Sequence, residues 1–120
     1  MIRNNSMAAK KIAVAFFTTE NGAAPVRDWL LAMSGEDRKT IGEDIKTVEF
    51  GWPIGMPVCR PLGKGLYEVR TNLKDRIARV FFTVDDGKMV LLHGFIKKSQ
   101  ATPETELDVA RMRLKQWRRS

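Results

Sequence analysis

The chain has 120 residues, the length of one ordinary domain, and its hydrophobic fraction of 43% is enough for a buried core. Its net charge of +7 does not select a fold, but it favours an anionic partner such as nucleic acid, an anionic membrane or an acidic protein. One cysteine excludes an intramolecular disulfide, and one cysteine with one histidine makes a zinc site of such ligands untenable.

The location and domain organisation also follow from simple patterns. No apolar run reaches the roughly 20 residues that cross a bilayer, and the first residues lack the apolar stretch of a signal peptide. Together with the lone Cys59, this favours a reducing, cytoplasmic location. We expect a flexible tail over residues 1–9 and a single domain over 10–120.

The N-terminal half predicts one strand followed by two helices. Residues 12–19, IAVAFFTT, are apolar and rich in β-forming types, so they predict a strand. Pro25 suits the first turn of a helix, where its missing N–H costs nothing. Ser34 with Asp37 resembles a capping box and begins a second helix, which ends near Gly51.

The C-terminal half predicts three strands and a closing helix. Strand-forming runs cover 66–71, 76–84 and 88–96, and the short turns between them predict an antiparallel meander. Thr102 is a good N-cap and Pro103 a good first residue for the last helix. The order β-α-α-β-β-β-α predicts an α+β fold, with two N-terminal helices packed on one face of a small antiparallel sheet and a C-terminal helix.

Most of the informative positive charge lies in or beside the predicted meander. Because adjacent strands lie about 4.8 Å apart, cations distant in sequence can converge on one sheet face. If the helices cover the other face, such a surface would hold a sugar–phosphate backbone. The alternative is that the cations are scattered and only keep the protein soluble. The residues are Arg60, Lys64, Arg70, Lys74, Arg76, Arg79, Lys97 and Lys98.

Two arginines and the only histidine are the candidate catalytic groups. Arg70 and Arg76 flank the turn at 72–75, so we expect them to be neighbours that fork onto phosphate oxygens. If they are structural instead, Glu68 is the obvious partner for either. His93 is the one imidazole and suits general acid or base chemistry, although its apolar strand VLLHGF equally suits a buried, hydrogen-bonded role. The acidic residues lie mainly in helices and turns, so we expect neither metal nor cofactor.

The motifs resemble those of a known family. The runs GLYEVRTNLKDRIARVFF and LLHGFIKKSQATPETELDVARMR, with PVRDWL in the first helix, are similar to the phage-derived, HigB-type branch of the RelE/ParE toxin superfamily over about residues 12–113. The resemblance implies a compact α+β toxin that cleaves mRNA without metal, usually on the ribosome. It also implies a HigA-like antitoxin with a helix-turn-helix domain. In RelE-like toxins the RNA 2′-hydroxyl attacks the adjacent phosphate, and basic residues neutralise the developing charge.

The resemblance also implies roles for particular residues. Arg70 matches the arginine that ends the family's central strand, and Arg76 matches the arginine that opens the next strand and grips phosphate. Lys98 matches a basic residue after the last strand, usually arginine. With His93, these are the expected catalytic residues. The expected RNA-binding residues are Arg60, Lys64, Lys74, Arg79 and Lys97.

The sequence also departs from the family. Leu66 and Glu68 stand where RelE has two lysines, and no tyrosine follows residue 98. His93, Lys97 and Lys64 are the substitutes that their chemistry suggests for the missing acid and base. Because the ParE branch inhibits DNA gyrase, three functions stay open: an endoribonuclease, a non-catalytic gyrase-directed toxin and a simple RNA-binding module.

Overall fold

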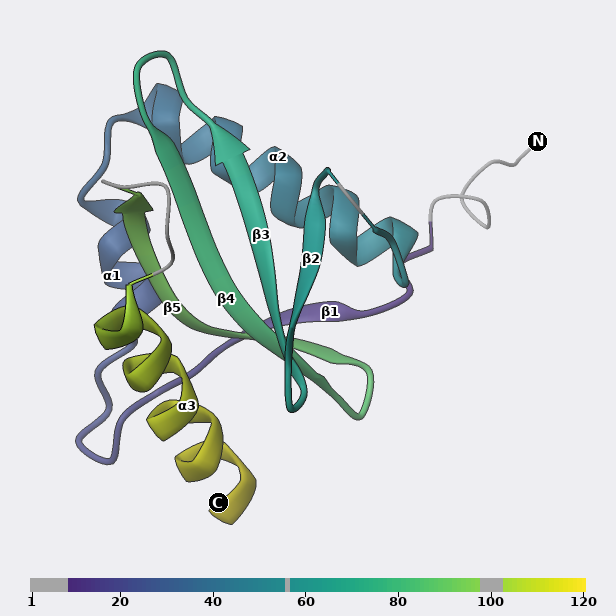
Figure 1. Ribbon diagram of the computed structural model, residues 1–120, viewed down its shortest axis with the longest axis vertical. Coiled ribbons are helices and arrows are strands. Elements are labelled where there is room, and N and C mark those ends of the chain that lie inside the picture. Colours follow the sequence, from purple (N-terminus) through teal and green to yellow (C-terminus); the bar gives the residue numbers. More distant parts are fainter. Residues whose placement is uncertain (1–8, 56, 98–102) are drawn as a thin grey trace.

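The computed structural model describes residues 9–55, 57–97 and 103–120, which form an α+β fold (Figure 1). The predicted fold class is confirmed. Lys98 and Thr102 lie outside the described residues, as does the expected tail apart from Ala9. The elements are β1 (Ala13–Phe16), α1 (Pro25–Leu31), α2 (Gly35–Gly51), β2 (Cys59–Gly63), β3 (Leu66–Asn72), β4 (Ile77–Asp85), β5 (Lys88–Lys97) and α3 (Glu104–Arg119).

The strands form one mixed sheet in the order β1-β5-β4-β3-β2. Strands β3, β4 and β5 make the predicted antiparallel meander, but β1 pairs parallel with β5, where Ala13 lies beside Lys88. The sheet is therefore not wholly antiparallel as expected. It also contains a strand that the sequence pattern did not predict, β2, which Pro61 and Gly63 interrupt. Because β2 is an edge strand, one of its sides needs no ladder donor, and proline is tolerated there.

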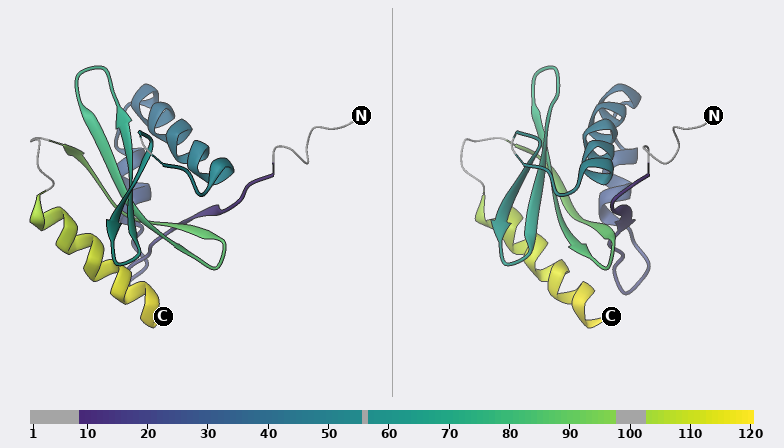
Figure 2. Two further views of the ribbon diagram at one scale, coloured as in Figure 1. Left: turned by 45° about the vertical axis from the view of Figure 1, so that its right-hand side comes forward. Right: turned by 90° about the vertical axis from the view of Figure 1, so that its right-hand side faces the viewer.

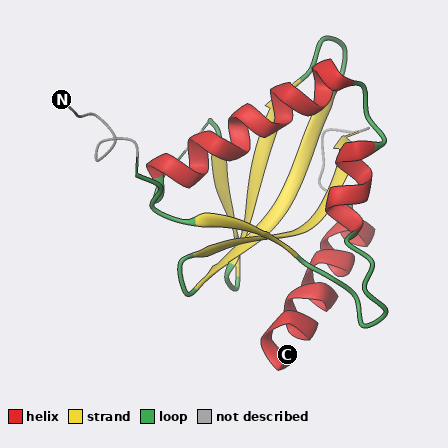
Figure 3. Cartoon of the chain, turned by 180° about the vertical axis from the view of Figure 1, so that it is seen from behind, coloured by secondary structure: helices red, strands yellow, loops and turns green. Residues whose placement is uncertain are grey.

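Helices cover both faces of the sheet. Helices α1 and α2 lie on one face, where Val48 of α2 belongs to the same buried cluster as Phe82 of β4. Helix α3 lies on the opposite face, where Leu114 belongs to a second cluster with Phe81 of β4. Figure 2 shows the sheet between α2 and α3, and Figure 3 shows the α1–α2 face from behind. Successive strand residues point to opposite faces, so β4 supplies both clusters.

The predicted helix starts agree closely with the structure. The Asp37 N–H donates to Ser34 Oγ at 3.1 Å, which confirms the cap of α2, and α1 begins at Pro25. Helix α3 begins one residue later than predicted, because Pro103 has an extended backbone and takes the N-cap position. None of the helices in the described ranges has the length and apolar character needed to cross a membrane.

Helix α1 packs closely on strand β5 because that strand carries a glycine at the contact. A Cβ built on Gly94 of β5 would lie 2.5 Å from Cε3 of Trp29, so the indole ring rests directly on the strand backbone. Gly94 lies opposite Val80, on the face that α1 and α2 cover. The missing side chain at this position is therefore what lets α1 approach β5 so closely.

Candidate functional site

Four adjacent strands place cations on the face of the sheet that also carries α3. Strand pairing sets Arg70 opposite Arg79, and residues in register share a face. Arg60 lies opposite Glu68 and Lys97 opposite Ile77, so the alternation along β3 and β4 puts both on the same face as Arg70 and Arg79. Desolvation, followed by the charges of Arg70, Arg79 and Arg60, lowers the pKa of Lys97. We define the cation cluster as Arg60 (β2), Arg70 (β3), Arg79 (β4) and Lys97 (β5).

A buried carboxylate lies within the cation cluster. Glu68 is only 2% exposed; its Oε1 lies 3.5 Å from Arg60 Nε, and its Oε2 binds the guanidinium of Arg79. Arg79 is 1% exposed, and its guanidinium carbon lies 5.4 and 5.5 Å from the ring centres of Phe81 and Phe95. Burial, and then the charge of Arg60, lowers the pKa of Arg79. Arg79 therefore lies beneath the surface at which RNA contact was expected.

The accessible charge of the cluster comes from its other three members. Arg70 is exposed, the Arg60 side chain is 42% exposed, and Lys97 is half-buried. Within the part of the chain that the structure describes, no carboxylate lies within ion-pair distance of Arg70 or Lys97. These two charges are thus available to an anionic ligand. Helix α3 packs mainly on β5 and β4, and it reaches β3 at Leu66, which shares a buried cluster with Leu114 of α3. This contact lies at the start of β3, whereas Arg70 lies near the end of that strand.

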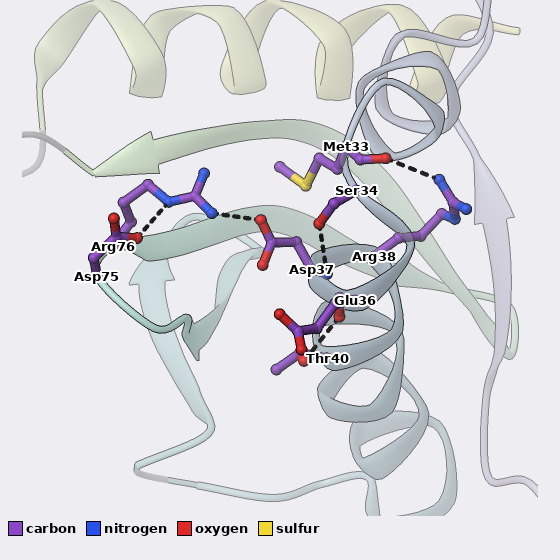
Figure 4. Close-up of polar contacts among 8 residues, drawn as sticks. All are labelled: Met33, Ser34, Glu36, Asp37, Arg38, Thr40, Asp75 and Arg76. Atoms are coloured by element: carbon purple, nitrogen blue, oxygen red, sulfur yellow. Dashed lines mark hydrogen bonds and ion pairs between the residues drawn. The ribbon is translucent and has the colours of Figure 1, made fainter.

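Arg76 lies outside the cation cluster. Its guanidinium binds Asp37 in the first turn of α2, and its Nε lies 3.0 Å from Asp75 Oδ1 (Figure 4). The hydrogen bond to Asp37, followed by that to Asp75, raises the pKa of Arg76. The expected pairing of Arg70 with Arg76 is not formed, because the register sets Arg79 opposite Arg70 and leaves Arg76 in the turn.

Both ring nitrogens of His93 meet residues of α3. His93 Nε2 lies 2.5 Å from Glu106 Oε1, and Arg113 Nη1 lies 3.4 Å from Nδ1 while it donates to the Leu92 carbonyl at 2.8 Å. A guanidinium can only donate, so the contact at Nδ1 requires the proton of a neutral ring to sit on Nε2, which donates to Glu106. The ring also stacks on Phe95, with ring centres 5.5 Å apart. His93 thus takes the hydrogen-bonded position that its apolar strand suggested.

The sequence analysis missed Glu106 and Arg113 as partners of His93. Their spacing of two helical turns places them on the same face of α3, which is the signal that could have found them. Burial of Arg113, which lies over the ring of Phe17 at 5.9 Å, lowers its pKa.

The other predicted RNA-binding residues lie apart from the cluster. Lys64 lies in the turn before β3 and Lys74 in the turn after it, so the two occupy opposite ends of that strand. Lys64 lines a groove of about 420 Å³ together with residues of α3. Burial raises the pKa of the Cys59 thiol, which keeps it in the unreactive protonated form. The described residues contain no group of three or more His, Cys, Asp or Glu side chains placed to hold a metal ion.

Comparison with known proteins assigns the chain to a family. A search of curated protein sequences finds no significant match. The family described as phage-derived protein Gp49-like matches residues 28–115. This range runs from α1 into α3 and includes the whole cation cluster, Glu68 and His93. The chain therefore belongs to the phage-derived Gp49-like family.

Proposed function

We propose that the protein is the toxin of a type II toxin–antitoxin pair and that it cleaves mRNA without a metal ion. The Gp49-like family consists of toxin-like proteins, and the motifs shared with HigB-type toxins supply the finer assignment. The observation that carries the proposal is the cation cluster. It combines two cations that no described carboxylate pairs with, Arg70 and Lys97, and its one acid, Glu68, is buried.

Such a cluster suits cleavage by the neighbouring hydroxyl of RNA. The 2′-oxygen bonds to the adjacent phosphorus, the bond to the 5′-oxygen of the next nucleotide breaks, and the products are a 2′,3′-cyclic phosphate and a 5′-hydroxyl. The 2′-hydroxyl loses its proton and the leaving oxygen gains one. Negative charge grows on the phosphate in the transition state, where fixed guanidinium donors are most effective.

The geometry ranks the candidate catalytic residues. Arg70 combines exposure with a bidentate fork, so it is the first candidate for holding the scissile phosphate. Lys97 has a lowered pKa, which brings it closer to proton transfer than an ordinary lysine. Arg76 and Lys98 are candidates through the resemblance, and His93 through its chemistry. We further propose a HigA-like helix-turn-helix antitoxin as partner, the ribosome as the site of cleavage and the cytoplasm as location.

Induced expression followed by mapping of mRNA 5′ ends tests this function. We expect new 5′-hydroxyl ends within translated messages. Purified protein should also cut free RNA in the presence of EDTA, and loss of cleavage that Mg²⁺ restores would contradict the metal-free reaction. Growth arrest without new RNA ends, together with inhibited gyrase supercoiling, would assign a gyrase-directed toxin instead. RNA binding without cleavage or gyrase inhibition would leave a simple RNA-binding module.

A further inference from the structure

A basic groove lies between the β2–β3 turn and the C-terminal half of α3. Its volume is about 420 Å³. The floor contains Leu66 and Leu114, which belong to the buried cluster under α3. Five cations line it and none of its lining residues is acidic; the cations are Lys64, Arg111, Lys115, Arg118 and Arg119.

The groove and the cation cluster open on the same face of the sheet. Leu66, Glu68 and Arg70 alternate along β3, so they point to one side of it, and Leu66 lines the groove while Arg70 belongs to the cluster. Their separation of four residues along the strand corresponds to about 13 Å. That length matches a few nucleotides of an extended strand.

The cations that α3 contributes to the groove are not there to stabilise the helix. Arg111 and Lys115 are four residues apart, and like charges at this spacing destabilise a helix. Arg118 and Arg119 complement the negative end of the helix dipole, but Arg111 and Lys115 precede the last turn and gain little from it. The arrangement therefore has a cost in the free protein that an anionic ligand would relieve.

One arginine of α3 lies close to the turn across the groove. A Cβ on Gly65 would lie 2.7 Å from Nη2 of Arg118, so the guanidinium lies against the glycine backbone. Gly65 also has a φ of +84°, which other residues rarely adopt. The exposed Arg118 side chain therefore lies beside the turn that carries Lys64, and the groove has positive charge on both sides.

We propose that this groove binds the phosphate backbone of the RNA strand that flanks the nucleotide held at the cation cluster. The inference rests on the proposed RNA substrate and adds a second binding site for it. The lining residues include no aromatic ring on which a base could stack, so the groove recognises charge and not base sequence. Cations on both walls and continuity with the cluster favour a linear polyanion over an acidic protein segment.

Length-dependent binding tests the inference. The probes are a non-cleavable 2′-O-methyl dinucleotide, whose single phosphate cannot occupy the cluster and the groove together, and a 2′-O-methyl oligonucleotide of roughly 16 nucleotides, the upper limit of typical single-strand site sizes. Fluorescence anisotropy compares the wild type with the variant Arg111→Gln/Lys115→Gln. The matched control, Lys39→Gln/Lys46→Gln, removes the same charge from α2, on the other side of the sheet. Circular dichroism confirms that each variant is folded.

We expect the groove variant to bind the long probe about 10-fold more weakly, with a salt slope smaller by roughly 0.7 for each phosphate that the variant no longer neutralises. It should bind the short probe like the wild type, and the control variant should change little with either. Equal affinities of groove and control variants for the long probe would overturn the inference while leaving the proposed function intact. A groove variant that keeps RNA binding but loses affinity for a polyglutamate peptide would assign the groove to an acidic protein segment. Failure of the wild type to bind either RNA would overturn both proposals.

Discussion

Arg70 of β3 lies directly opposite Arg79 of β4, and the first side chain is exposed while the second is buried against Glu68. Like charges on opposite strand positions repel, but Glu68 offsets the charge of the buried partner. The charge of Arg70 therefore remains at the surface. The charge of Arg76, unlike that of Arg70, is paired with carboxylates, because Asp37 and Asp75 bind the Arg76 side chain at the turn.

The ranking of the two arginines leads to a first prediction. Arg70→Lys keeps a positive charge but removes the planar fork. If Arg70 holds the phosphate in the transition state, the variant should cut a defined RNA roughly 10²-fold more slowly. Arg76→Lys should lower the initial rate much less, because its present partners are the carboxylates of Asp37 and Asp75.

Arg27→Lys is the control for this comparison, since Arg27 is an exposed residue of α1 on the other side of the sheet. Initial rates are measured on folded proteins with the same RNA. A wild-type rate for Arg70→Lys, combined with a large loss for Arg76→Lys, would move the scissile phosphate to the 72–76 turn.

A second prediction concerns the buried ion pair. Glu68→Gln removes the carboxylate that binds the buried guanidinium of Arg79, so the free energy of unfolding should fall by about 3–5 kcal/mol. The double variant Glu68→Leu/Arg79→Met replaces both charges with apolar side chains and should recover much of this loss. Denaturation in urea measures each value.

Asp75→Asn is the control for the ion pair, because the Asp75 side chain is 78% exposed. It should unfold at nearly the same urea concentration as the wild type. A loss below about 1 kcal/mol for Glu68→Gln, within the range of exposed ion pairs, would show that the carboxylate contributes little to stability.

Lys97 gives a third prediction, on pH. Desolvation and the three arginines of the cation cluster lower its pKa, so it loses its charge at a lower pH than an ordinary lysine. RNA affinity should therefore begin to fall at a lower pH than it would with a lysine of ordinary pKa. Lys97→Arg keeps its charge throughout this range and should flatten the decline.

A 2′-O-methyl oligonucleotide resists alkaline hydrolysis and serves as the probe for this titration. Lys39→Arg, on α2, controls for the general exchange of lysine for arginine. Identical pH profiles for the wild type and Lys97→Arg would mean that Lys97 does not contact the RNA.

The contact between α1 and β5 gives a fourth prediction. In Gly94→Ala the new methyl group would meet the ring of Trp29 at 2.5 Å, so the core must shift and stability should fall by roughly 1–3 kcal/mol. In α2, Gly42→Ala meets nothing within 4 Å and should raise stability by up to about 1 kcal/mol. Thermal melting compares the two. Equal melting temperatures for Gly94→Ala and the wild type would show that Trp29 moves aside freely.

The local features of the fold were readable from the sequence. Ser34 and Pro25 fix helix starts through chemistry within one turn, and the meander follows from alternating strands joined by short turns. The parallel pairing of β1 with β5 could not be predicted from the sequence, because it joins distant segments and no local pattern encodes it. Strand β2 escaped prediction because Pro61 and Gly63 suppress a strand pattern, although an edge position permits both.

In the candidate site, too, features set by local sequence were predictable and features set by distant contacts were not. Strand spacing suggested that some of the eight cations in or beside the meander could converge, and Arg70 with Lys97 follows from that geometry. The position of Arg60 does not, because it lies on β2, which was not predicted. The position of the Arg76 side chain could not be predicted, since it depends on Asp37 in α2, which is distant in sequence. The burial of Arg79 also required the packing of α3-side aromatic rings, which composition does not reveal.

The parallel pairing of β1 with β5 matters for a chain that is still being synthesised. Ala13 pairs with Lys88, so the first strand made has no partner until the last strand has emerged. Closing so long a loop has an entropic cost that must be met before the contacts form, which makes this pairing late. Lys97 lies at the end of that same last strand. A nascent chain therefore acquires its complete sheet and its complete cation cluster together, once residue 97 has emerged.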